Sequence, residues 1–239
     1  MLIKIYQVNA EKSEDARFAL FSGTERLKRE LKTDTTNPEW YKLVYVGDHP
    51  DIVTLEEVFF DFNDKRIPTL QGHSLSVSDV VEVLEDTDCV EKGFYFCDDI
   101  GWKNIKFDAS KAEGMEGIKV IYVRPKCRPV VTHIWKELKF LQDAVSMRGE
   151  DSLIEFIYPF TGDMNHMILV GNEEAALIDM PFTFTDKDPA PLDEICTLNG
   201  GLQGPVFVTR DSDEDDGELA SLTDEDIEKL EKVFDIVIK

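Results

Sequence analysis

The sequence predicts an α+β protein of two small domains, each a mostly antiparallel sheet with packed helices. Short runs of β-branched and aromatic residues alternate with segments that carry apolar residues at helical spacing. The 239 residues suffice for two modest hydrophobic cores. Residues 108–117 (DASKAEGMEG) contain two glycines and lack apolar periodicity, which indicates a linker between a domain at residues 1–107 and a domain at residues 118–239.

Apolar spacing in the first domain predicts two helices, and a serine cap predicts one helical turn. A helix is expected over residues 13–31, where one Ala and three Leu residues at steps of four, seven and four share one face. Residues 55–62 carry Leu, Val, Phe and Phe at i, i+3, i+4 and i+7, the pattern of a short amphipathic helix. Ser76 or Ser78 is expected to cap a helical turn whose first residues include Asp79, because a serine oxygen accepts hydrogen bonds from the free N–H groups there.

Strands of the first domain are predicted where β-branched and aromatic residues gather. The expected strands cover residues 2–8, 41–46, 81–84, 93–99 and 102–107. The last of these is a short strand or a turn, so this domain is expected to have strands at both of its ends.

The second domain is predicted to contain one internal and one terminal helix, over residues 135–145 and 221–234. Thr223 can cap the terminal helix, and the three acidic residues that follow suit the positive end of its dipole. In the first helix, one face is expected to carry Trp135, Leu138, Leu141 and Val145, and in the second the buried stripe is expected to consist of Ile227, Leu230 and Phe234.

Strands are expected to make up most of the rest of the second domain. They are predicted at residues 118–125, 129–134, 152–159, 166–171, 206–210 and 235–239. The third and fourth of these are expected to be neighbours in one sheet. The glycine-rich segment NGGLQGP fits no phosphate-binding loop, since no Gly-Lys-Ser/Thr follows, and is interpreted as a turn.

Charge is the most unusual property of the composition. The chain has 49 Asp and Glu residues against 26 Lys and Arg residues, a net charge of −23, of which −8 falls on residues 1–107 and −15 on residues 108–239. Such a charge repels nucleic acid and anionic membranes, because affinity for both depends on Lys and Arg. We therefore expect a basic partner protein and no direct binding to nucleic acid or membrane. The plainest alternative is that the acidity serves solubility alone.

The sequence also indicates a compartment. The N-terminus has no basic region followed by a long apolar stretch, and no run of 18 apolar residues occurs, so neither a signal peptide nor a membrane span is expected. The four cysteines are widely spaced and form no CxxC pair, which is typical of reduced thiols. A cytoplasmic protein is the resulting expectation.

Several segments of the first domain follow one another in a recognisable order: IYQVN, RLKRE, YKLVYVGD, and GHSLSVSDVVEV followed by YFCDDIGWKNI. In these segments the domain resembles the YodL-like domain. Through IKVIYVRP, IEFIYPF, HMILVGNEEAALIDMPFT and LTDEDIEKLEKVF, the second domain resembles an uncharacterised bacterial domain family. Proteins of both kinds are encoded mainly on conjugative elements and phages, often near antirestriction genes. The resemblance implies an accessory protein of mobile genetic elements, and it implies no catalytic residue or cofactor.

The acidic run DSDEDDGE, residues 211–218, is the main candidate for a binding site. Its alternating aspartates suggest an EF-hand, but Asp216 stands where that loop needs glycine and Leu222 stands where it needs a bidentate Glu. A mobile acidic loop is the plain interpretation, and a patch that binds a basic partner is the functional one. Partner contact is expected from Asp211, Asp213, Glu214, Asp215 and Asp216.

No catalytic or metal-binding motif is complete. The segment HSLSVSDVV lacks the G-x-S-x-G pattern of a nucleophile elbow, and the four histidines form neither HExxH nor a close cluster with cysteine. The adjacent acids Asp98/Asp99 and Glu173/Glu174 would point to opposite faces of a strand. We therefore expect no catalytic, cofactor or metal site, and an unrecognised hydrolase is the remaining enzyme hypothesis.

Two binding functions fit these observations. The leading hypothesis is an anti-defence inhibitor (antirestriction or anti-CRISPR) that acts as an acidic DNA mimic on a basic nucleic-acid-binding protein. At one charge per ~1.7 Å, its net charge corresponds to about 40 Å of duplex, or roughly twelve base pairs. The alternative is an adaptor or regulator that binds another protein of the element's own transfer or replication machinery. An exposed apolar patch or open strand would favour the adaptor, and a continuous acidic ridge would favour mimicry.

Overall fold

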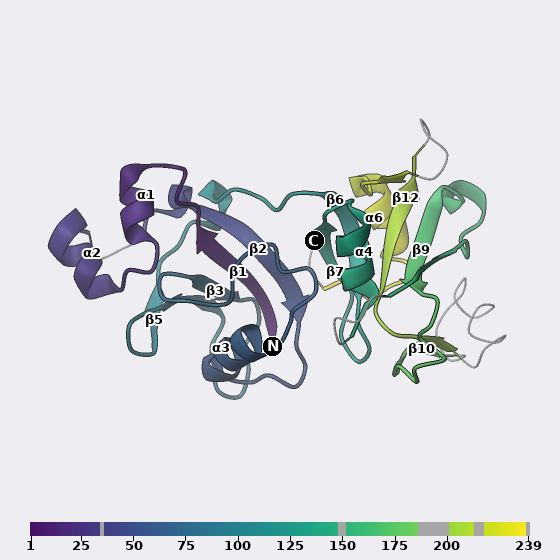
Figure 1. Ribbon diagram of the computed structural model, residues 1–239, viewed down its shortest axis with the longest axis horizontal. Coiled ribbons are helices and arrows are strands. Elements are labelled where there is room, and N and C mark those ends of the chain that lie inside the picture. Colours follow the sequence, from purple (N-terminus) through teal and green to yellow (C-terminus); the bar gives the residue numbers. More distant parts are fainter. Residues whose placement is uncertain (34–35, 148–151, 186–200, 213–217, 238–239) are drawn as a thin grey trace. The chain divides into compact units, whose positions relative to one another are not determined.

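The computed structural model divides into two compact units, Met1–Met115 and Glu116–Lys239. The structure describes residues 1–33, 36–147, 152–185, 201–212 and 218–237 (Figure 1). Strands pair antiparallel in the sheets of both units, which confirms the predicted α+β class. None of the described helices combines the length and the apolar character that a membrane span requires.

A five-stranded sheet in the order β2-β1-β3-β4-β5 is the frame of the first unit. Alternation along β1 sends Ile3 and Ile5 to one face and Tyr6 and Val8 to the other. Both faces of the sheet therefore carry a hydrophobic core. The strands are β1 (Leu2–Val8), β2 (Tyr41–Asp48), β3 (Val80–Val83), β4 (Gly93–Cys97) and β5 (Trp102–Ile105).

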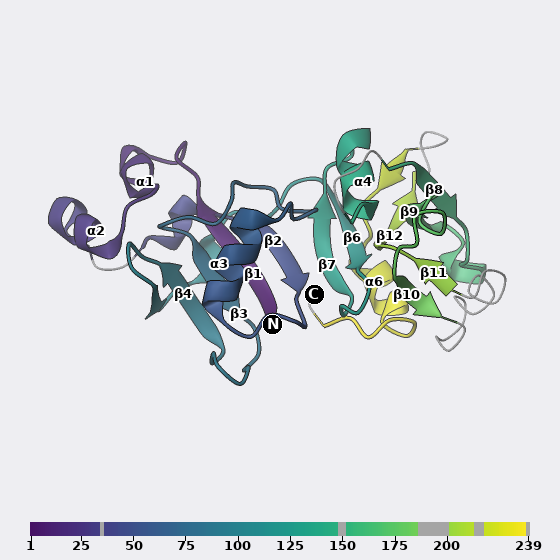
Figure 2. The ribbon, with the colours of Figure 1, turned by 60° about the horizontal axis from the view of Figure 1, so that its bottom comes forward.

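Helix α3 (Leu55–Asp64) covers one face of this sheet, as Figure 2 shows. It begins at a capping box, in which the Thr54 hydroxyl accepts a hydrogen bond from the Glu57 N–H at 3.2 Å and the Glu57 carboxylate accepts one from the Thr54 N–H at 2.9 Å. The side chains buried against the sheet are Leu55, Val58 and Phe62. The predicted amphipathic helix is confirmed, although Phe59, expected on the buried face, lies at its edge and is 37% exposed.

The single helix predicted over residues 13–31 is wrong, because two helices occupy that range. They are α1 (Glu14–Ala19) and α2 (Thr24–Leu31). Phe21 has a φ of +59°, which interrupts the helical path, and Gly23 is the N-cap of α2. A Cβ atom on Gly23 would lie 2.1 Å from Asp99 Oδ2, so the close approach of another segment fixes the break. The apolar spacing gives no sign of this break, because side chains of both helices pack into one hydrophobic core.

The carboxylate of Asp98 caps the start of α2 from a distant part of the chain. It accepts hydrogen bonds from the Thr24 N–H at 2.9 Å and the Thr24 hydroxyl at 2.7 Å, and Lys103 Nζ lies 2.5 Å from Oδ2. Burial alone would raise the pKa of Asp98, but the hydrogen bonds from Lys103 and Thr24 outweigh it and lower this pKa to about 2. The cap therefore joins α2 to the turn between β4 and β5.

The segment after β5 is built largely into the first unit. It contains the 3₁₀ helix η2 (Ala109–Lys111). Glu113 then pairs with β2, its N–H donating to the Tyr41 carbonyl at 2.9 Å and its carbonyl accepting from the Leu43 N–H at 2.8 Å. These backbone bonds cover part of the outer edge of β2.

The second unit contains a larger antiparallel sheet in the order β7-β6-β12-β9-β8, with β13 paired to the end of β12. β8 and β9 are neighbours, as predicted. β10 and β11 form a separate two-stranded sheet. The strands are β6 (Ile118–Val123), β7 (Val130–Ile134), β8 (Ile154–Ile157), β9 (Met167–Asn172), β10 (Phe182–Thr185), β11 (Gly201–Gln203), β12 (Val206–Asp211) and β13 (Leu219–Ala220).

Two helices pack on the sheet of the second unit. Helix α6 (Asp224–Leu230) is confirmed, because Thr223 caps it and its predicted stripe of Ile227, Leu230 and Phe234 is buried. Helix α4 (Leu138–Val145) begins three residues later than predicted. Leu138, predicted to share one face with Leu141 and Val145, is 57% exposed, while Leu141, Ala144 and Val145 form the buried side.

Three short strands of the second unit were not predicted, namely β10, β11 and β13. The segment interpreted as a turn contains β11, in which Gly201 has a φ of +146° and approaches Phe182 so closely that a Cβ atom would lie 2.5 Å from that ring. The closing strand predicted at residues 235–239 is absent from residues 235–237, and the last two residues lie outside the described ones. Such short strands depend on a partner strand more than on their own composition.

Replacing Asp98 with Asn should lower the free energy of unfolding at pH 7 by about 1–2 kcal/mol, because the charge that binds Lys103 and the N-terminus of α2 is lost. The folded-state pKa of Asp98 lies below its ordinary value. Its contribution is therefore complete above that ordinary value and disappears as the pH falls toward the folded pKa of about 2. Denaturant unfolding at a series of pH values should show wild type and variant converging in acid.

The matched control is Asp99→Asn, which changes an exposed neighbour. This variant should stay within about 0.5 kcal/mol of wild type. Equal losses in both variants would contradict a specific role for Asp98.

Candidate partner-binding groove

The acidic residues predicted to contact a partner are only partly described by the structure. Asp211 is the last residue of β12, and its N–H donates to the His166 carbonyl at 2.9 Å. Residues 213–216 lie outside the described residues. Partner contact by Asp211, Asp213, Glu214, Asp215 and Asp216 stays a prediction.

The serine-rich segment before β3 forms a tight turn, so the predicted helical turn is wrong. Ser78 has a φ of +84°, and its backbone N–H donates to the Cys97 carbonyl at 2.9 Å. The Ser76 N–H donates to the carboxylate of Asp79 at 2.8 Å, which replaces the expected serine cap. The Ser78 hydroxyl accepts a hydrogen bond from the Phe21 N–H at 3.1 Å. The two serines thus have structural partners.

A buried contact between Gln7 and Asp79 holds this turn on β1. Gln7 Nε2 donates to Asp79 Oδ2 and to the His73 carbonyl, both at 2.9 Å, and Gln7 Oε1 accepts from the His73 N–H at 3.0 Å. A Cβ atom on Gly72 would lie 2.0 Å from Gln7 Oε1, so a larger residue there would displace the Gln7 amide from its hydrogen bonds. Asp79 is fully buried, and its burial raises its pKa well above the ordinary value, against the opposing hydrogen bonds from Ser76 and Gln7.

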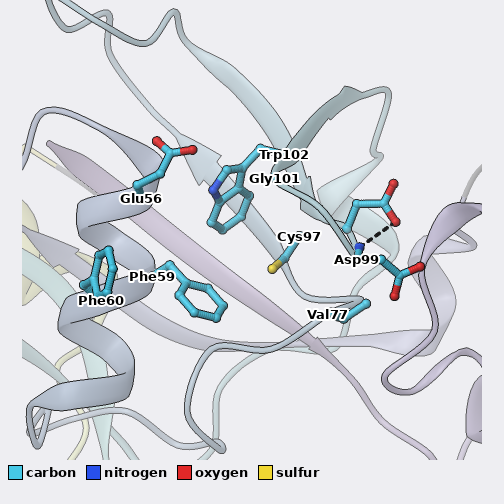
Figure 3. Close-up of a pocket in the computed structure, with 9 residues that line it drawn as sticks. Glu56, Phe59, Phe60, Val77, Cys97, Asp99, Gly101 and Trp102 are labelled. Carbon is cyan, nitrogen blue, oxygen red and sulfur yellow. Dashed lines mark hydrogen bonds between the residues drawn. The ribbon is translucent and has the colours of Figure 1, made fainter.

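A groove opens where β4 passes into β5, beside α3, and encloses about 250 Å³. We call it the aromatic groove. Its lining residues are Glu56, Phe59, Phe60, Val77, Cys97, Asp98, Asp99, Gly101 and Trp102. Figure 3 shows the rings of Phe59 and Trp102 turned toward the hollow from α3 and from the start of β5.

Helical spacing explains why large apolar side chains face solvent at this groove. Positions 55, 58 and 62 of α3 face the core, and Glu56, Phe59 and Phe60 share the neighbouring side at i, i+3 and i+4. Phe60 is 69% exposed, and Ile100, next to the lining residues, is 93% exposed. Adjacent exposed apolar side chains of this kind mark interaction sites more often than scattered single ones.

The lining of the aromatic groove offers no activated nucleophile. Burial, with the nearby charges of Asp79 and Asp98, raises the pKa of the Cys97 thiol to about 12, so this thiol stays protonated near neutral pH. Asp98 is engaged with Thr24 and Lys103, which leaves Glu56 and Asp99 as the exposed carboxylates. Within the described ranges, no three His, Cys, Asp or Glu side chains converge to hold a metal ion.

The groove was missed by sequence reasoning, although one signal for it is present. An amphipathic α3 needs apolar residues on one side only, yet Phe60 adds an aromatic residue on the acidic side of the helix. The approach of Trp102 depends on how β4 and β5 pair, which spacing along the chain does not encode.

Replacing Asp79 with Asn should make unfolding less dependent on pH. A carboxyl whose folded pKa is raised favours folding below its ordinary pKa, and this contribution is lost as the pH rises toward the folded pKa. Asn keeps an acceptor oxygen for Gln7 and Ser76 and cannot ionise. Denaturant unfolding between pH 4 and pH 8 should therefore show a smaller loss of stability in Asp79→Asn than in wild type. Parallel curves would contradict a raised pKa for Asp79.

Comparison with known proteins assigns both domains to families. Residues 2–107 match the YodL-like domain, and residues 118–235 match a domain of unknown function, DUF3846. Both resemblances inferred from the sequence are confirmed. No curated protein and no solved structure matches the chain. The chain therefore combines a YodL-like domain with a DUF3846 domain.

Proposed function

We propose that this chain is a non-enzymatic accessory protein that binds a basic partner protein through the aromatic groove of its YodL-like domain. The observation that carries this proposal is the exposure of Phe59 and Phe60 beside a hollow whose exposed carboxylates are Glu56 and Asp99. Aromatic side chains that enter a desolvated contact supply much of the energy of protein interfaces.

The charge of the chain supports a basic partner. A net charge of −23 attracts a basic surface over a distance of about one Debye length, ~8 Å at physiological salt, and speeds the encounter. Contact at the aromatic groove then depends on apolar burial, which salt weakens much less. Binding of this kind should fall with salt through its rate of association, while its rate of dissociation changes little.

The two mobile-element functions differ in how much they need this groove. An adaptor within the element's own machinery would bind through apolar contacts, and the aromatic groove supplies them. An anti-defence DNA mimic would bind mainly through charge, and its support is the net charge of −23. The groove favours the adaptor, because a DNA surface presents phosphates to its protein and no comparable aromatic projection.

Capture of partners from bacterial lysate by the whole chain tests the proposal, with the retained proteins identified by mass spectrometry. Phe60→Ala should weaken capture of the specific partner at least tenfold, equivalent to about 1.4 kcal/mol. The matched control is Tyr158→Ala in the DUF3846 domain, where a comparable side chain is 64% exposed. It should leave capture unchanged.

The outcomes separate the proposals. Capture that Phe60→Ala leaves intact contradicts a role for the groove. Release of a nucleic-acid-binding protein by high salt and by added duplex DNA would establish mimicry. Retention of a partner in the presence of DNA, with loss in Phe60→Ala, would establish the adaptor.

A further inference from the structure

We propose that the aromatic groove binds an arginine side chain of the partner, with the guanidinium held between the rings of Phe59 and Trp102 and with Glu56 as its counter-ion. This inference deepens the proposed function and rests on it. It names the chemical group that the groove recognises, whereas the proposed function specifies only a basic partner protein.

The two rings come from different elements that are each fixed by the core. Phe59 lies on α3, one helical turn after Glu56, so both side chains leave the same side of the helix. Trp102 begins β5, pairs with Cys97 of β4, and packs partly buried against the core beneath α3. In Figure 3 the rings face the hollow from two sides, with Glu56 on the side of Trp102. The walls of the site are thus present before any ligand binds.

The negative charge of the groove is available to a ligand at Glu56 and Asp99. Lys103 lies 2.5 Å from Asp98 and neutralises that carboxylate, which is further engaged by Thr24. By contrast, Glu56 and Asp99 have no cation within 4 Å among the residues that the structure describes. At Glu56 an incoming cation therefore meets a carboxylate without an existing ion pair, whereas the charge of Asp99 already acts on Lys103.

The guanidinium group suits this combination of rings and carboxylates better than other side chains do. It is planar, stacks on aromatic faces, and donates several hydrogen bonds in the plane of the group to a carboxylate. An ammonium group is more strongly hydrated and has no flat face to stack. An uncharged apolar side chain would leave the carboxylate of Glu56 partly desolvated without a partner. A hollow of about 250 Å³ has room for a long side chain.

NMR titration of the whole chain with short peptides tests the inference. The probes are acetyl-Leu-Arg-Leu-amide and the same peptide with citrulline, which has nearly the same shape without the charge, or with lysine. The readout is the indole Nε1–H signal of Trp102, which the spectrum of Trp102→Phe identifies among the three tryptophans. The arginine peptide should shift this signal saturably and bind at least fivefold tighter than the other two.

Variants distinguish a guanidinium site from a general apolar surface. Glu56→Gln should reduce binding of the arginine peptide to the level of the citrulline peptide. The control Asp64→Asn, an exposed acid at the other end of α3, should leave it unchanged. Equal binding of arginine and citrulline peptides, equal binding of lysine, or no saturable shift would each overturn the inference. The proposed function would still stand in those cases if Phe60→Ala abolishes partner capture, so the two failures are distinguishable.

Discussion

The buried contact between Gln7 and Asp79 is the interaction on which the arrangement of the YodL-like domain depends. It ties β1 to the turn before β3 across more than seventy residues of sequence. The backbone of that turn bonds in both directions to Cys97, which fixes the end of β4. The next residue, Asp98, caps α2 and lines the aromatic groove. One buried amide–carboxyl pair is therefore linked, through the backbone bonds to Cys97 and through the neighbouring Asp98, to the start of α2 and to the aromatic groove.

In each domain, the carboxylate of a buried aspartate accepts a backbone hydrogen bond at the start of a helix, Asp98 at α2 and Asp226 at α6. In the DUF3846 domain, Asp226 completes the capping box of α6 with Thr223 and also lies 2.9 Å from His166 Nε2. Burial would raise the pKa of Asp226, but the hydrogen bonds from His166 and Thr223 lower it overall. Acids such as Asp79, Asp98 and Asp226 are thus occupied inside the fold. The net charge of −23 consequently overstates the negative surface that a partner meets, which weakens any argument from total charge to DNA mimicry.

The sequence predicted those parts of the fold whose pattern is local. Strand β1, helix α3 and helix α6 follow from β-branched runs, apolar spacing and a capping residue. The break between α1 and α2 did not follow, because it involves distant segments: the Phe21 N–H donates to the Ser78 hydroxyl, and Asp98 and Asp99 lie close to Gly23. The aromatic groove was not predicted either, because it too depends on contacts between distant segments. Its two rings are separated by more than forty residues and meet only through sheet pairing and helix packing.

Charge and apolar surface act at different ranges in this chain. Long-range attraction by an acidic surface discriminates only between basic and acidic partners, so by itself it cannot select one protein among many. Selection of one partner requires short-range contacts, so that a wrong partner leaves a desolvated polar group without a hydrogen bond or counter-ion. In the described part of the first domain, exposed aromatic rings stand beside unpaired carboxylates at the aromatic groove. Under the proposed function, the specificity of the YodL-like domain should therefore follow the few side chains around Phe59 and Trp102, while the surrounding acidity can vary with little effect on partner choice.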